Sequence, residues 1–323
     1  MISQDVSQVE YVEKKPIGRI KGYSLEQRLQ LWGWAFISPW IIGFLLFILF
    51  PMLASFVISF TDFNLMHPDD VKFVGLKNYI ALGSDPMLIT ATIATLKFAL
   101  LALPVAIMLP IFLAGLLNAS LLKGKRLFLT LFYMPYIVPV VSVVFIWQAY
   151  LNQEAGWFNR LLGLIGIQGP NWINSVDFIY PAMVMIGLWG LGNALLITFA
   201  AMRGVPTELF EAARVDGASA LTIFFKIIIP MISPVIFYNL ILSVIGVFRY
   251  FEIPYILGRG QGQPGNATYF YSIHLYKNAF TYQEMGYGST LAWVLFVISL
   301  LVTVALFLTS RYWVYNSTGD NQI

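Results

Sequence analysis

The chain has 323 residues, of which 59% are hydrophobic and only 11% are charged. This apolar fraction exceeds that of ordinary soluble domains and indicates a membrane protein. The net charge of +3 is spread over several short loops, which argues against nucleic-acid binding, and the lack of cysteine excludes disulfides and thiolate metal sites.

Six apolar stretches are long enough to cross the hydrocarbon core of a bilayer, which requires about 20 residues of helix. The sequence therefore predicts an all-α, polytopic membrane protein with six transmembrane helices. The polar segment before the first stretch has no signal-peptide cleavage pattern, so we expect it to remain as a tail outside the bilayer. The predicted spans are 31–60, 91–118, 127–151, 176–202, 231–254 and 289–311.

The positions of Lys and Arg predict the orientation, because positive charges near span ends are retained on the cytoplasmic side. With the N-terminus inside, twelve of the 19 basic residues fall in cytoplasmic segments and five fall in outer loops. We therefore expect a bacterial-type cytoplasmic (inner) membrane protein with both termini in the cytoplasm. The loop 203–230 then also faces the cytoplasm.

The chain lacks the residues of several energy-coupling and catalytic sites. The fragment nearest to a phosphate-binding loop has Arg126 where a serine or threonine would bind magnesium. The predicted spans have no pair of midplane acids, as a proton-coupled carrier or an intramembrane aspartyl protease would require. His67 and His274 lie in separate predicted outer loops, where solvation or loop packing is favoured over metal binding. The chain is therefore not expected to be an enzyme, and energy for any transport must come from a partner; a secondary carrier is the rival class.

The predicted cytoplasmic loop contains the charged stretch TELFEAARVDGASALTIFFKIIIP. Thr207 can cap a short helix, and Gly217 can adopt the left-handed conformation that ends it. A second helix is expected from about Leu221. Ala212 and Ala213 would allow another protein to approach the first helix closely. From composition alone, an ordinary loop between two spans is an equally good interpretation.

The same loop contains, at fixed spacing, Glu211, Ala212, Ala213, Gly217, Ile227, Ile229 and Pro230. This order resembles the EAA motif of ABC importer permeases, with isoleucine at position 229 where leucine is usual. Longer stretches, such as GLLNASLLKGKRLFLTLFYMPYIVP, are similar to the sugar-permease branch related to the maltose transporter. The loop GRGQGQPGNAT is similar to a glycine-rich loop of that branch but carries extra residues. The resemblance covers about residues 31–311.

The resemblance implies a type-1 ABC importer permease fold, in which a cytoplasmic coupling helix at 207–217 docks on an ATPase subunit. It implies a partnership with a second homologous permease, two ATPase subunits that bind ATP and magnesium, and an extracytoplasmic substrate-binding protein. No cofactor is expected in this chain. The coupling residues would be Glu211, Ala212, Ala213, Asp216 and Gly217. The implied segments are a tail at 1–30, a first span at 31–60, an outer loop at 61–87, the type-1 domain at 88–311 and a tail at 312–323.

Two predicted helix faces could line a substrate path near the middle of the bilayer. Trp189 and Asn193 are four residues apart, and Ser243 begins an i, i+3, i+4, i+7 set at a similar depth. Aromatic rings can stack on a sugar while amides and hydroxyls bond its rim, so these residue types suit a glycan. The same side chains could instead pack between helices. Similarity to the sugar-contacting positions of the maltose permease implies a path with Trp189, Gly190, Asn193, Ser243, Gly246, Val247 and Tyr250.

Arg249 lies in the outer half of the predicted fifth span, where a charge is costly unless it faces water or a partner. Glu252 follows three residues later, so an intrahelical ion pair is one interpretation. The alternative is contact with an anionic substrate, such as a uronate (alginate-type) oligosaccharide or a glycerol phosphate. Trp157 and Trp172 suit anchoring at the membrane interface. The resemblance thus implies import of a sugar such as an oligosaccharide, with an anionic substrate as the alternative.

Overall fold

The computed structural model describes residues 24–119 and 122–316, so the remaining residues of both predicted tails lie outside it. Within the described residues the structure is helical, with one isolated β-bridge between Thr61 and Phe73 and no β-strand. The chain divides into two compact units, of which the first ends at Ser55 and the second begins at Phe56.

The first unit is built on one helical run, which comprises α1 (Leu25–Phe44), a π-helical turn (Leu45–Leu49) and the start of α2 (Phe50–Ile58). The helix begins earlier than position 31, where the first span was predicted to start. Ser24 accepts a hydrogen bond from the backbone N–H of Gln27, whose side chain bonds back to the backbone of Ser24. This capping box extends the helix into the polar segment.

Two π-helical turns stand directly before prolines. The turn Leu45–Leu49 precedes Pro51, and the turn Phe224–Ile228 precedes Pro230. Proline has no backbone N–H and its ring crowds the carbonyl four residues earlier, which favours a wider preceding turn, although the helix Pro86–Asn118 contains Pro104 and Pro110 without one. The helix continues in both places, which shows that one wider turn accommodates the ring.

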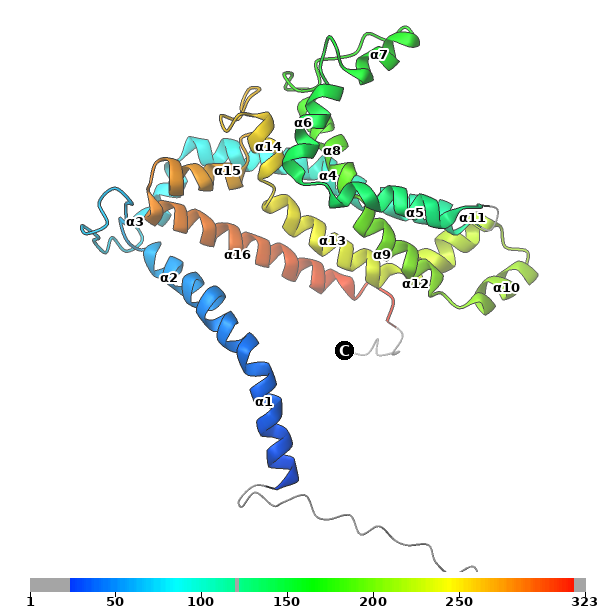
Figure 1. Ribbon diagram of the computed structural model, residues 1–323, viewed down its shortest axis with the longest axis horizontal. Coiled ribbons are helices and arrows are strands. Elements are labelled where there is room, and N and C mark those ends of the chain that lie inside the picture. The colour runs from blue at the N-terminus through cyan, green and yellow to red at the C-terminus, as the bar shows by residue number, and fades with distance from the viewer. Residues whose placement is uncertain (1–23, 120–121, 317–323) are drawn as a thin grey trace, which may run out of the picture. The chain divides into compact units, whose positions relative to one another are not determined.

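Among its described residues, the second unit contains three helical stretches long and apolar enough to span a bilayer and two bent pairs of helices (Figure 1). Its longest helix, α4 (Pro86–Asn118), has 33 residues and therefore a length of about 50 Å, more than the bilayer core requires. The other helices are α3 (Lys77–Ala81), α5 (Lys125–Tyr133), α6 (Val140–Tyr150), α7 (Trp157–Leu164), α8 (Ile179–Gly187), α9 (Gly192–Arg203), α10 (Thr207–Val215), α11 (Ala220–Ile223), α12 (Ile229–Met231), α13 (Ser233–Phe248), α14 (Glu252–Leu257), α15 (Tyr271–Tyr276) and α16 (Met285–Ser310).

Two of the predicted spans are bent pairs of helices. The third consists of α5 with a 3-10 turn to Ile137, followed by α6 at an angle of 104°. Pro135 and Pro139 explain this break, because neither can donate a helical hydrogen bond. The fourth consists of α8, a 3-10 turn (Leu188–Gly190) and α9, with a bend of 58°. Four described helices are long and apolar enough to span a bilayer, or six if each bent pair is one span, so the six-span topology stays a prediction.

The fifth predicted span is interrupted near its C-terminal end, within the stretch Ser233–Leu257 that is long and apolar enough to span a bilayer. Helix α13 ends at Phe248, and α14 starts as a separate helix at Glu252. Tyr250 therefore lies beyond the helix that carries Ser243, and the predicted i, i+7 relation between them does not hold.

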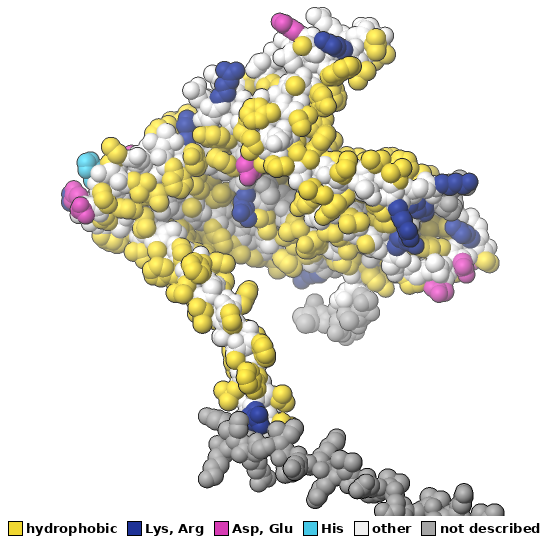
Figure 2. Space-filling view, in the orientation of Figure 1, with side chains coloured by type: hydrophobic (Ala, Val, Ile, Leu, Met, Phe, Trp, Pro, Cys, Tyr) yellow, Lys and Arg dark blue, Asp and Glu magenta, His cyan; other side chains and the backbone are white. Residues whose placement is uncertain are grey.

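Two clusters of buried side chains hold the second unit together. One surrounds Phe270, Met183 and Val144, where α4, α6, α8 and α14 meet. The other surrounds Leu195, Met202 and the end of α4, next to α12. Lys and Arg side chains gather at the end of this unit that carries α10 and α11 (Figure 2), which is the predicted cytoplasmic end.

Candidate functional site

A cavity of about 300 Å³ is lined by α4, the broken pair α8–α9 and α13. Its wall contains many small residues, including Gly187, Gly190 and Gly246, which leave open space beside the backbone. The ring of Phe98 stacks on that of Tyr250, with centroids 4.7 Å apart. An aromatic surface facing an open glycine-lined wall can accommodate a ring-shaped ligand such as a sugar.

This cavity brings together five of the eight residues predicted for the substrate path. The five that line it are Gly190, Ser243, Gly246, Val247 and Tyr250. Trp189, Asn193 and Arg249 are not among its lining residues. Tyr250 reaches the cavity even though it lies past the end of α13. The contact of these residues with a substrate stays a prediction.

The side chain of Trp189 packs against α6. Its indole meets that of Trp147 edge to face, with ring centroids 6.0 Å apart. Among the described residues, neither indole N–H has a hydrogen-bond partner, although both are buried, and the same holds for the hydroxyl of Tyr250. Because leaving a buried donor unpaired costs about 1–3 kcal/mol, three such donors in one region are unusual. Trp147 was not predicted from the sequence, because an aromatic residue in an apolar span gives no signal of its own.

Arg249 is exposed at the C-terminal end of α13. No carboxylate of the described residues lies within ion-pair distance of it, so the ion pair with Glu252 considered above is absent from this structure. The reason is the helix break: Arg249 and Glu252 belong to different helices and do not share a helical face.

The predicted cytoplasmic loop contains a short helix, α10, that ends at a tightly bonded turn. The backbone N–H of Ala218 bonds to the carbonyl of Ala213 at 2.9 Å, and that of Gly217 to the carbonyl of Arg214 at 3.0 Å. These two bonds form a Schellman motif, in which Gly217 has a φ of 79°. Glycine is favoured there because this φ strains any side chain.

One detail of the loop differs from the sequence prediction. Thr207 is the first residue of α10 and makes no capping bond, because Pro206 occupies the cap position. The second helix begins at Ala220, close to the predicted Leu221, and the hydroxyl of Ser219 accepts a hydrogen bond from the N–H of Thr222.

Helix α10 presents its predicted coupling residues to the surface. Glu211, Ala212, Asp216 and Gly217 are exposed, and Ala213 is half-buried. Val215 is 88% exposed, so the helix also carries an uncovered apolar side chain beside these small residues. Such an exposed surface can receive another protein.

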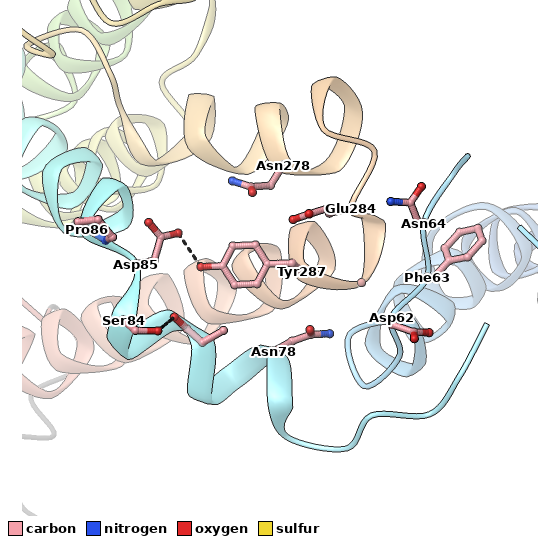
Figure 3. A pocket seen from close by; sticks show the side chains of 12 residues that line it. Asp62, Phe63, Asn64, Asn78, Ser84, Asp85, Pro86, Asn278, Glu284 and Tyr287 are labelled. Carbon is pink, nitrogen blue, oxygen red and sulfur yellow. Dashed lines mark hydrogen bonds between the residues drawn. The ribbon is translucent and has the colours of Figure 1, made fainter. Parts of the chain in front are cut away.

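A polar pocket of about 570 Å³ lies at the opposite end of the unit, between α3, the start of α4 and the start of α16. Figure 3 shows Asp62, Asp85 and Glu284 on its walls, together with Tyr287. Asp85 caps α4, since its Oδ1 accepts the N–H groups of Met87 and Leu88 at 2.9 and 3.0 Å. Its Oδ2 accepts the hydroxyl of Tyr287 at 2.7 Å (Figure 3).

The same carboxylate connects α4 to α15. The Nε2 of His274 lies 2.9 Å from Oδ2 of Asp85, and its Nδ1 lies 3.1 Å from the hydroxyl of Tyr269. A neutral imidazole that donates through Nε2 and accepts at Nδ1 satisfies both contacts. His274 is therefore buried on α15 and ties that helix to the start of α4. The capping role of Asp85 could have been predicted from the Asp-Pro pair at the start of α4, which is typical of a helix cap.

Burial and hydrogen bonding set the charge states of His274 and Asp85. Burial lowers the pKa of His274, against the opposing effect of the adjacent Asp85 carboxylate. Burial alone would raise the pKa of Asp85, but the hydrogen bonds from Tyr287 and from the N–H of Leu88, with the neighbouring His274, bring it below its ordinary value. Both shifts favour a neutral imidazole beside an ionised carboxylate.

These shifts predict a stability that depends on pH. Because the pKa of His274 is lower in the fold than its ordinary value of 6.5, the unfolded chain binds the proton more readily. Stability is therefore complete above pH 6.5 and is expected to fall as the pH decreases below it. Melting of the purified protein should show this loss, and His274→Gln should remove it. His67→Gln is the matched control, since His67 is the only other histidine and is exposed; equal slopes in the two variants would contradict the assignment.

Residues 106–316 match the family described as "Binding-protein-dependent transport system inner membrane component". A relative described as "Probable ABC transporter permease protein YesP", from Bacillus subtilis (strain 168), is 38% identical over 291 residues, which cover 89% of this chain and 93% of the relative. The "Arabinooligosaccharides transport system permease protein AraP" of the same organism is 34% identical, with coverage of 83% and 85%.

A solved structure shares the fold. It is the bacterial ABC transporter involved in the import of the acidic polysaccharide alginate, of which one chain superimposes with a TM-score of 0.76. The match covers 88% of this chain and 97% of that chain, at 22% sequence identity. At this identity the likeness concerns the fold alone.

Proposed function

This chain belongs to the family of binding-protein-dependent transport system inner membrane components, and from that premise we propose that it is the permease subunit of an ATP-driven sugar importer. The substrate is an oligosaccharide, carried across the cytoplasmic membrane by alternating access. The observation that carries this proposal is the cavity between α4, α8–α9 and α13, which combines stacked aromatic rings with a glycine-lined wall. The relative described as an arabinooligosaccharide permease supports the substrate class.

The energy for transport comes from partner subunits. Permeases of this family are membrane components, and we propose that two separate ATPase subunits bind ATP and magnesium. Helix α10 docks on one of them, with both termini of this chain in the cytoplasm. The Schellman motif at Gly217 fixes the angle between α10 and α11, so movement of α10 is passed to the π-helical turn and α13 rather than absorbed by the loop.

The remaining partners follow from the same proposal. A second homologous permease completes the transmembrane path, and an extracytoplasmic binding protein delivers the glycan. As the outer ends of α6, α8 and α14 separate, the buried indoles of Trp147 and Trp189 and the hydroxyl of Tyr250 gain hydrogen-bond partners from water or from glycan hydroxyls. This exchange offsets part of the cost of opening.

Reconstitution tests the function directly. The copurified permeases and ATPase subunits are placed in proteoliposomes with the binding protein, and uptake of labelled arabino-oligosaccharides and of other neutral oligosaccharides is measured. Uptake should require ATP, the ATPase subunits and the binding protein together. Uptake that continues without the ATPase subunits would instead identify a secondary carrier.

An anionic glycan is the second candidate, and the specific observation that favours it is Arg249. Its guanidinium is exposed, no carboxylate of the described residues pairs with it, and its neighbours Val247 and Tyr250 line the cavity. In the same assay, Arg249→Gln should reduce uptake of uronate oligosaccharides selectively if the substrate is anionic, because a charge-assisted hydrogen bond is lost. An equal proportional loss of neutral and anionic glycan uptake in this variant would leave the neutral oligosaccharide as the substrate.

A further inference from the structure

Helix α7 stands apart from the substrate cavity and from α10. Six residues separate it from the end of α6 at Tyr150, and it belongs to the connection between α6 and α8. Figure 1 shows it at the tip of the projecting arm that α6 and α8 form. The arm carries apolar side chains over much of its visible surface (Figure 2), although the connection lies outside the predicted spans.

One side chain holds α7 in a fixed orientation. The amide nitrogen of Asn159 donates to the carbonyls of Gln153 and Pro170, both at 3.0 Å, and its oxygen accepts the indole N–H of Trp172 at 2.7 Å. Gly169 allows this close approach, since a Cβ there would collide with the amide of Asn159. Trp172, expected above at the membrane interface, is thus half-buried inside the connection.

The hydrogen bonds of Asn159, which we call the clamp, give α7 an inward face and an outward face. Phe158 turns inward and packs against Trp147 and Trp172, with ring centroids 5.8 and 6.3 Å apart. The opposite side, with the residues that follow the helix, carries large apolar side chains that are at least half exposed. We name it the interfacial face; it consists of Trp157, Leu161, Leu164, Ile165 and Ile167.

The chemistry of the interfacial face matches a bilayer surface. An amphipathic helix with aromatic and aliphatic side chains on one face is typical of segments that lie in the membrane plane. Trp157 has the ring type enriched at the boundary between headgroups and acyl chains. The guanidinium of Arg160 lies over that ring at 5.7 Å, and its length would let it reach a phosphate while the ring enters the lipid. The adjacent span α6 also exposes Phe145 and Tyr150, so the apolar surface continues from the span to α7.

We propose that α7 lies in the membrane–water interface on the outer side of the cytoplasmic membrane. The interfacial face is immersed in lipid, and the hydrogen bonds of Asn159 act as a clamp that fixes the orientation of the helix. The segment then anchors the projecting arm to the bilayer. This goes beyond the transport function and requires only that the chain spans a membrane.

Site-directed spin labelling tests the proposal cleanly, because the chain has no cysteine. Single cysteines replace Leu164, 83% exposed on the interfacial face, and Asn174, an exposed residue of the same connection that lines a second, polar pocket with Asn152 and Asn171. The copurified assembly is placed in nanodiscs of phosphatidylcholine and phosphatidylglycerol. The nitroxide at Leu164 should be relaxed more strongly by oxygen, which partitions into lipid, than by a water-soluble nickel chelate, and the nitroxide at Asn174 should show the reverse.

Two outcomes would overturn the proposal. Access of nickel to Leu164 equal to that at Asn174 would place the interfacial face in water. Protection of Leu164 from both reagents would mean that another protein covers it. Adding Asn159→Ala to the variant labelled at Leu164 should weaken the preference for oxygen several-fold. An unchanged preference would show that Asn159 does not fix the orientation of α7. None of these readouts depends on transport, so they stand or fall separately from the proposed function.

Discussion

Replacing Gly217 with valine is expected to reduce uptake by about tenfold or more while leaving the chain inserted in the membrane. At a φ of 79°, a β-branched side chain costs about 1–2 kcal/mol or more, and each 1.4 kcal/mol is a factor of about ten in an equilibrium. Apart from Gly217 and its two chain neighbours, no heavy atom of the described chain lies within 4 Å of the position that a Cβ would take. The effect therefore comes from backbone strain alone, which shifts α10 away from its docking angle.

Gly217→Asn is the matched control, because asparagine tolerates the left-handed conformation. It should retain most of the uptake. ATPase subunits that copurify with each variant are quantified by mass spectrometry, and we expect fewer with valine than with asparagine. Glu211→Lys tests the docking surface without altering the backbone and should also weaken association. Normal uptake in both Gly217→Val and Glu211→Lys would remove this loop from the mechanism.

Filling the cavity should have an effect of comparable size. Gly246 lines the cavity, and the described chain leaves open space where a Cβ would stand. Gly246→Leu should therefore fold and assemble, yet obstruct the path and lower glycan uptake at least tenfold. Gly246→Ala adds only one methyl group and should transport nearly as the unmodified protein does. Equal uptake in the leucine variant would show that the glycan passes elsewhere.

A loss caused by misfolding has a different signature. A Cβ on Gly192 would lie 2.5 Å from the carbonyl oxygen of Phe132, so Gly192→Ala should lower the melting temperature, whereas Gly246→Leu should not.

Tyr250→Phe tests whether the cavity wall contacts the glycan, because this variant does not obstruct the path. It removes a buried hydroxyl that has no partner among the described residues, so stability should hold or rise. Reduced uptake despite that stability would identify the hydroxyl as a glycan contact.

The sequence alone determined the class of the protein and the local structure of the loop 203–230. Apolar stretches of fixed length identify membrane helices because the bilayer demands about 20 residues regardless of how they pack. The end of the helix at Gly217 could likewise be predicted from adjacent residues alone. An Asp-Gly pair after a helix-forming segment favours the left-handed turn that the structure contains. The family followed from residue order, and the matching region bears it out.

The tertiary structure alone decided how those helices are broken and which side chains share a space. Pro135 and Pro139 permit a bend, but its 104° depends on packing around them. Trp189 and Tyr250 were placed on one path by helical spacing, yet the 3-10 turn and the end of α13 send their rings toward different neighbours. Asp85 and His274 are 189 residues apart and meet only when α4 and α15 pack. Contacts of this kind depend on many weak interactions summed over the whole fold, so they cannot be predicted from the periodicity of a single segment.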